Sequence, residues 1–145
     1  YIITDEDSVV AHWLKAGADG FVIGCLDPEG NLDSRAMAPL LQAAQGCGLT
    51  LHRCIDVSRD PCKTYLDAGK LGIDTVLTSG GAANCYAGKE NIAALVELRD
   101  QKNGPEVLIG AGVNAKMPVV AIGGIQSPDA VLHLQDFSQF DRYFR

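Results

Sequence analysis

The stretch GIDTVLTSG, residues 72–80, places a short apolar run between a glycine turn and a polar end that contains glycine. GADGFVIG at 17–24 and GPEVLIGAG at 104–112 share this pattern, and LTLHRCI at 49–55 is an apolar run of similar length. Short apolar runs bounded by turn residues are typical of buried β-strands. We therefore predict strands at residues 21–26, 49–55, 75–80 and 106–112.

Segments with helical spacing separate these runs. Apolar residues recur three and four positions apart within residues 34–45, 60–72 and 89–101. Asp60 followed by Pro61 is typical of the start of a helix. The runs recur at about the length of one strand–helix–strand unit, roughly 30 residues. Parallel strands need such long crossovers, so we predict an α/β fold with parallel strands.

The ends of the predicted strands favour a barrel within this class. Three of the stretches, GADGFVIG, GIDTVLTSG and GPEVLIGAG, finish in glycine or hydroxyl residues, and a TIM-type barrel places its site at the carboxyl ends of its strands. A doubly wound sheet would favour a GxGxxG motif after its first strand, and the sequence has none there. A full (β/α)8 barrel needs about 200 residues or more, whereas this sequence has 145. We predict one domain over residues 1–145, a partial TIM-type barrel with four to five βα units.

Composition narrows the environment and the partners. The net charge is −6, with 47% hydrophobic and 21% charged residues and no cluster of lysine and arginine, so no nucleic-acid partner is evident. No apolar run approaches the ~18 residues that a membrane span requires, and nothing resembles a signal peptide. The five cysteines are an odd number without a CxxC pair, which favours reduced thiols. We expect a cytoplasmic protein without a membrane partner.

The predicted strand at 49–55 is unusually polar. Alternation along a strand would place His52, Cys54 and Asp56 on one face, toward the barrel lumen, and Arg53 on the other. From there Arg53 could reach a carboxylate such as Asp56 or Asp74. This interpretation predicts that the strand lines a site. The alternative is that His52 and Asp56 only hydrogen-bond each other inside the barrel.

Candidate metal ligands lie at the ends of the first two runs. Cys25 could supply a thiolate near the barrel mouth, although a buried cysteine is more often a small apolar residue. Cys54 lies two residues from His52, and thiolate with imidazole suits Cu(I) or Zn(II). We therefore predict Cys25, Cys54 and His52 as metal ligands.

Candidate anion-binding residues lie at the ends of the last two runs. Thr78, Ser79, Gly80 and Gly81 could hold an anion with hydroxyl and backbone N–H groups, or could form a plain turn. Gly110 and Gly112 would let a ligand approach the backbone. Together with Arg53, these residues predict a site for a small anionic ligand.

Four motifs occur in a fixed order at residues 24–33, 51–56, 77–80 and 110–112. They resemble the Gly-x-Leu-x-x-x-Gly-x-x-Asp, Phe-His-Arg-Ala-Phe-Asp, Leu-Thr-Ser-Gly and Gly-Ala-Gly motifs of the CutC copper homeostasis family. The resemblance covers about residues 1–116. It implies a single (β/α)8-type barrel that binds Cu(I) for buffering or trafficking. Cys54 stands where the family usually has alanine, so the resemblance does not imply that Cys54 is a ligand.

The sequence also departs from the family. The two βα units that begin family members, with Glu-Leu-Cys and Arg-Pro-Arg-Gly-Gly strands, have no counterpart here, so ligands from them cannot be transferred. The run KMPVVAIGGIQSP at 116–128 follows the fourth run too closely for a helical crossover, and we treat residues 117–145 as a divergent tail. An incomplete barrel exposes sheet edges and an apolar face, which predicts self-association.

Two classes of function follow from these residues. The resemblance implies a copper-handling protein. The alternative is a TIM-barrel enzyme that acts on a small anionic or carbonyl substrate, with His52 or Asp56 as the acid or base. This alternative is favoured by the lack of an obvious Cys/Met copper cluster in the sequence.

Overall fold

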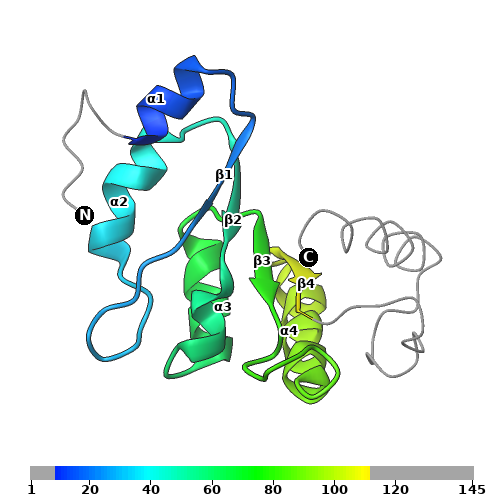
Figure 1. Ribbon diagram of the computed structural model, residues 1–145. Coiled ribbons are helices and arrows are strands. Elements are labelled where there is room, and N and C mark those ends of the chain that lie inside the picture. The colour runs from blue at the N-terminus through cyan, green and yellow to red at the C-terminus, as the bar shows by residue number, and fades with distance from the viewer. Residues whose placement is uncertain (1–8, 112–145) are drawn as a thin grey trace.

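Every predicted strand run overlaps an observed strand, and strands that are neighbours in sequence pair in parallel (Figure 1). The computed structural model describes residues 9–111. The sheet has the order β1-β2-β3-β4 and is formed by β1 (Gly20–Ile23), β2 (Gly48–Leu51), β3 (Thr75–Thr78) and β4 (Glu106–Ile109). This order confirms the prediction of an α/β fold with adjacent parallel strands.

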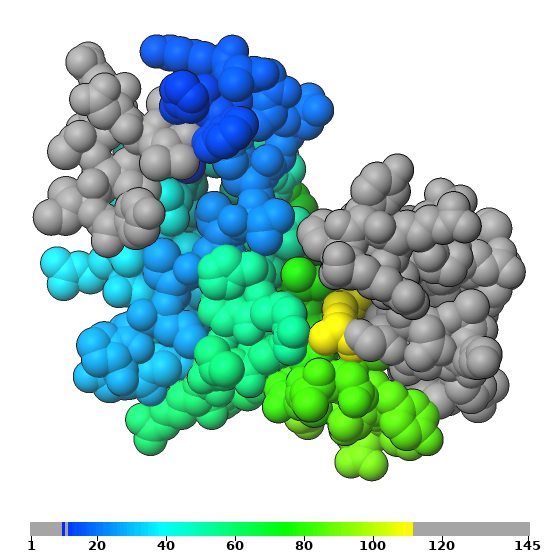
Figure 2. All heavy atoms as spheres, viewed as in Figure 1, coloured from blue at the N-terminus to red at the C-terminus, as the bar shows by residue number. Residues whose placement is uncertain are grey.

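Helices precede and connect these strands, and capping side chains set the starts of two of them. The helices are α1 (Val9–Lys15), α2 (Ser34–Ala43), α3 (Pro61–Lys70) and α4 (Lys89–Lys102). Asp33 caps α2 by accepting hydrogen bonds from the next turn's backbone N–H groups. Asp60 caps α3 in the same way, with Pro61 in the first turn as predicted. In the space-filling view the successive units follow one another in chain order, from blue to yellow (Figure 2).

The hydrophobic core lies between α2, α3 and α4 and one face of the sheet. Ile23, Leu51 and Val76 are aligned across three strands and are almost fully buried on that face. From the helices, the core receives Met37, Tyr65, Ala68 and Leu95. The opposite face is more open, with Val22 of β1 62% exposed. The sheet therefore has one helix-covered face and one face that a barrel would turn toward its lumen.

The middle of the sheet has the shortest strand pairing. The β1–β2 and β3–β4 ladders each align four residue pairs, whereas β2–β3 aligns only Thr50 with Thr75 and Leu51 with Val76. Asp74 extends this ladder at its amino-terminal end. Its carboxylate accepts a hydrogen bond from the Leu49 N–H at 2.8 Å, and its own N–H donates to the Leu49 carbonyl at 2.9 Å.

The predicted strand at residues 49–55 is wrong beyond Leu51. The chain turns there into a 3-10 helix, η1 (Arg53–Val57). His52 caps this helix because its Nδ1 accepts a hydrogen bond from the Cys54 N–H at 3.1 Å. A 3-10 turn places residues three apart on the same side, so strand alternation does not apply to residues 53–57.

Several predictions fall outside residues 9–111. They concern Gly112, the apolar run at 116–128 and the divergent tail at 117–145. Within residues 9–111, none of the helices combines the length and the hydropathy that crossing a bilayer requires.

Candidate functional site

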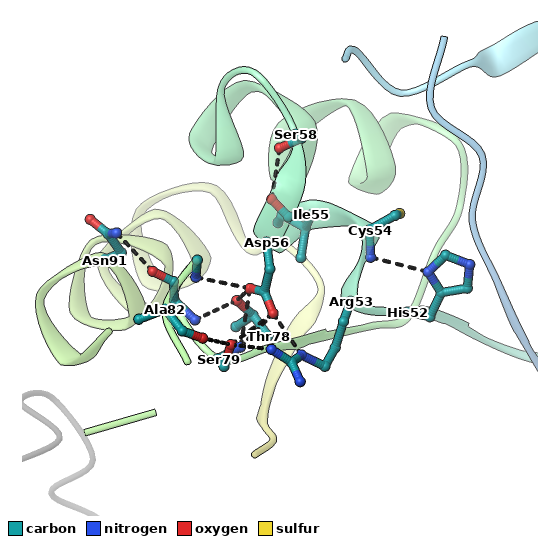
Figure 3. Close-up of polar contacts among 12 residues, drawn as sticks. His52, Arg53, Cys54, Ile55, Asp56, Ser58, Thr78, Ser79, Ala82 and Asn91 are labelled. Atoms are coloured by element: carbon teal, nitrogen blue, oxygen red, sulfur yellow. Dashed lines mark hydrogen bonds and ion pairs between the residues drawn. The ribbon is translucent and has the colours of Figure 1, made fainter. Parts of the chain in front are cut away.

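The carboxylate of Asp56 is the centre of a cluster at the carboxyl end of β2 and β3 (Figure 3). It accepts hydrogen bonds from the Thr78 hydroxyl at 2.5 Å, the Ser79 N–H at 3.0 Å and the Gly81 N–H at 3.0 Å. The Ser79 hydroxyl lies 2.9 Å away, and the Arg53 Nε donates at 2.8 Å. The side chain of Asp56 is only 6% exposed. This carboxylate therefore joins η1 to the end of β3 and continues the short β2–β3 pairing.

These contacts hold Asp56 in its charged form. Burial raises the pKa of Asp56. The hydrogen bonds from Thr78, Arg53, Ser79 and Gly81 together lower it by more, so the pKa lies below the ordinary value of 3.8. A base that is ionised, buried and bonded on both oxygens has little capacity to take a proton from a substrate. The predicted anion cradle of Thr78 and Ser79 exists, but it holds an anion from the protein itself.

Glycines allow the loop after β3 to close around this carboxylate. Gly80 and Gly81 have φ angles of 74° and 70°, a region that favours glycine. A Cβ at Gly80 would lie 2.1 Å from the Gly88 carbonyl oxygen, so only glycine fits. The Asn91 side-chain amide donates to the Gly80 carbonyl at 2.8 Å and fixes the loop to α4. Gly80 therefore has a conformational role, and its N–H donates to the Thr78 hydroxyl.

Arg53 lies on the same side as Asp56, not on the opposite face that strand alternation predicts. Its Nε donates a hydrogen bond to the Asp56 carboxylate at 2.8 Å, and its Nη2 donates one to the Ser79 hydroxyl at 2.6 Å. The proposed pairing of Arg53 with Asp56 is thus confirmed, because the 3-10 turn brings residues three apart together. Asp74 instead bonds to the backbone of Leu49.

His52 points away from this cluster (Figure 3). Its described partner is the Cys54 N–H, and the contacts of Asp56 do not include His52, so the His52–Asp56 hydrogen bond considered from the sequence is not formed. Because Nδ1 accepts a hydrogen bond, the neutral ring carries its proton on Nε2. His52 and Asp56 therefore do not act as one acid–base pair in this arrangement.

Cys25 and Cys54 come from different loops to the same end of the sheet. Gly24, which precedes Cys25 in the chain, packs against the side chains of η1, since a Cβ there would lie 2.7 Å from the Cys54 Sγ and 2.8 Å from the His52 Cε1. Burial raises the pKa of Cys54 to about 11, and the nearby Cys25 thiol adds to this. Burial and then Asp33 raise the pKa of Cys25. Both thiols are thus protonated at neutral pH and pack beside the core.

The three predicted metal ligands do not form a preformed metal site, although Cys54 lies near both Cys25 and His52. Within residues 9–111, no group of three or more His, Cys, Asp or Glu side chains is arranged to hold a metal ion. Soft thiolates select Cu(I) over harder ions. The donor chemistry of Cys25 and Cys54 therefore fits Cu(I), provided that the ion displaces their protons.

Gly110 serves packing between β3 and β4. Its N–H donates to the Thr78 carbonyl at 2.9 Å, and a Cβ would meet the Leu77 side chain at 2.9 Å. This N–H is therefore not directed at a ligand. Sequence reasoning missed the role of Gly24, which the site needs for close approach; its position directly after β1 was the available signal. The N–H of Gly81, which was expected to face an anion, donates to Asp56.

These features define the class of the protein: an α/β protein of parallel βα units, with its polar cluster at the carboxyl end of the sheet. A model described as the CutC family matches residues 2–127, and the chain belongs to this family. The match confirms the resemblance carried by the four motifs and runs past residue 116.

Curated relatives agree with this assignment. The chain is 45% identical over 106 residues to a CutC family protein of Xanthomonas campestris, covering 73% of this chain and 43% of the relative. A Xylella fastidiosa relative is 48% identical over 103 residues, covering 70% and 38%. A Bacteroides fragilis relative is 43% identical, covering 70% and 40%. The chain thus spans less than half the length of the curated relatives that it matches.

A solved structure supports the fold. The crystal structure of a copper homeostasis protein CutC from Streptococcus agalactiae matches with a TM-score of 0.67 and 28% identity, covering 74% of this chain and 52% of that chain. That neighbour has a TIM-barrel-like fold, as predicted for this chain.

Proposed function

We propose that this protein handles copper in the cytosol and binds Cu(I) through Cys25 and Cys54 for buffering or trafficking. The observation that carries the proposal is that two thiols, Cys25 after β1 and Cys54 on η1, lie close enough to interact electrostatically at the carboxyl end of the sheet. The description of the Streptococcus agalactiae neighbour as a copper homeostasis protein supports the same direction.

Proton release is the central chemical feature of this proposal. Because the pKa values of Cys25 and Cys54 are raised, Cu(I) must displace a proton from each thiol on binding. Affinity should therefore increase with pH until the thiols ionise. To become a third ligand, His52 would have to give up its hydrogen bond from the Cys54 N–H, because either the metal or the ring proton would then occupy Nδ1.

The enzymatic alternative receives no support from Asp56. Its pKa is lowered and both of its oxygens accept hydrogen bonds, which opposes a role as a general base. His52 alone would have to supply acid–base chemistry, and its Nδ1 already accepts a hydrogen bond.

The test is an anaerobic Cu(I) titration of the full chain against a competing colorimetric chelator. We expect about one Cu(I) per chain, and a large loss of affinity in the Cys25→Ser, Cys54→Ser variant because a soft ion loses its preferred ligands. Cys62→Ser is the matched control, since Cys62 is an exposed thiol on α3. Equal Cu(I) binding by the double variant and the control would refute the proposal.

A further inference from the structure

We propose that Arg53, held in place by Asp56 and Ser79, binds the carboxylate or phosphate group of a small molecule at the carboxyl end of the sheet. This proposal uses neither thiol and does not depend on copper binding. The inference rests on how the guanidinium is held and on which of its donors stay outward.

The hydrogen bonds of Arg53 use only part of its guanidinium. The group has five N–H donors in a fixed plane. One donor on Nε reaches Asp56 and one on Nη2 reaches the Ser79 hydroxyl. Within residues 9–111, Arg53 makes no further hydrogen bond or ion pair, and its side chain is 44% exposed. Nη1 and the second Nη2 proton therefore remain as a fork for an oxyanion.

The anchor fixes this fork before a ligand arrives. Asp56 is itself held by Thr78, Ser79 and Gly81, so the carboxylate that positions Arg53 has little freedom to move. An arginine that is already ordered loses less entropy on binding than a mobile one. Asp56 also accepts hydrogen bonds from these three residues, so Arg53 is not its only partner. The guanidinium therefore still attracts an external anion.

The other described arginines lack this combination of features. Arg35 and Arg59 are exposed and make no described side-chain hydrogen bond or ion pair. Arg99 is paired with Asp100 and Glu106, two exposed carboxylates that compete with any ligand. Among the arginines of residues 9–111, Arg53 alone is both fixed by a buried carboxylate and partly open. It also lies where barrel proteins bind their ligands.

The test measures binding of inorganic phosphate and of acetate to the full, metal-free chain by NMR titration. We expect saturable binding of at least one of the two anions, at least tenfold weaker in Arg53→Lys, which keeps the charge but loses the planar fork. Arg59→Lys is the matched control and should bind like the wild type. Preference for phosphate or acetate identifies the ligand group. No saturable binding of either anion, or equal binding by Arg53→Lys, would overturn the proposal.

A second measurement needs no variant. Phenylglyoxal modifies accessible arginines, and mass spectrometry reports the rate at each position. The anion that binds should slow modification of Arg53 several-fold and leave Arg59 unchanged. Equal slowing at both arginines, or none at Arg53, would show that the fork does not bind the anion.

Discussion

At the scale of single residues, the sequence identified the members of the polar cluster but not their roles. Arg53, Asp56, Thr78 and Ser79 were all predicted as site residues, because polar groups at strand ends are conspicuous. Their partners depend on the 3-10 turn, which no periodic pattern in LHRCID indicates. An external anion was expected where the protein supplies its own carboxylate.

Replacing Asp56 with Asn should destabilise the fold strongly. The amide keeps the size but offers one acceptor oxygen, so donors from Thr78, Ser79 or Gly81 lose a partner and Arg53 loses its counter-charge. Leaving a buried donor without its partner costs about 1–3 kcal/mol. Urea denaturation measures the loss. Asp67→Asn, which removes a partly exposed carboxylate paired with the exposed Lys63 and Lys70, should change the midpoint little.

The lowered pKa of Asp56 also predicts acid sensitivity. The folded state holds this carboxylate ionised below the ordinary value of 3.8, so the unfolded chain takes up the proton first as pH falls. The contribution is present above about pH 4 and is lost as pH falls through the folded-state pKa. Urea titrations at several pH values should show a steeper acid loss for the wild type than for Asp56→Asn. Identical slopes would contradict this prediction.

At the scale of elements, the recurring strand–helix period predicted the architecture well. The helix starts after Asp33 and Asp60 and the four parallel strands follow from local signals that agree with the tertiary fold. The end of β2 did not follow, because apolar residues such as Ile55 continue past it. Ile55 is fully buried, but it reaches the core from η1 and not from a strand.

Gly24→Ala should disrupt the junction between the end of β1 and η1. A methyl group there would lie 2.7 Å from the Cys54 Sγ and 2.8 Å from the His52 ring, so these side chains must move. Such overpacking costs about 1–3 kcal/mol, and Cu(I) affinity should fall if the thiols separate. Thermal denaturation and the Cu(I) titration test both effects. Gly48→Ala is the control, since nothing lies within 4 Å of the added methyl group.

At the scale of the whole molecule, β1 and β4 are the edges of the described sheet, and one face is open. Exposed edges and apolar faces favour association between copies. We therefore propose that the chain self-associates, as the sequence predicts for an incomplete barrel. The number of βα units in the sequence already indicated an incomplete barrel. Only the structure identifies Val22 as an exposed apolar residue on the edge strand.

Val22→Lys should reduce this association. A lysine on an edge strand discourages pairing with another copy. Sedimentation velocity over a range of concentrations should show association for the wild type and less for this variant. Val57→Lys is the matched control, because Val57 is 77% exposed but lies on η1. A wild type that sediments as a monomer at all concentrations would contradict the prediction.

The short β2–β3 ladder should divide the sheet into two units that open separately in amide hydrogen exchange. Only two residue pairs join these strands, and side chains of Asp56 and Asp74 supply bonds at either end. Local opening follows the line of fewest contacts. Native-state hydrogen exchange should therefore resolve β1–β2 and β3–β4 as separate foldons. In Asp74→Asn, the Leu49 amide should exchange faster while amides within the β3–β4 ladder keep their rates.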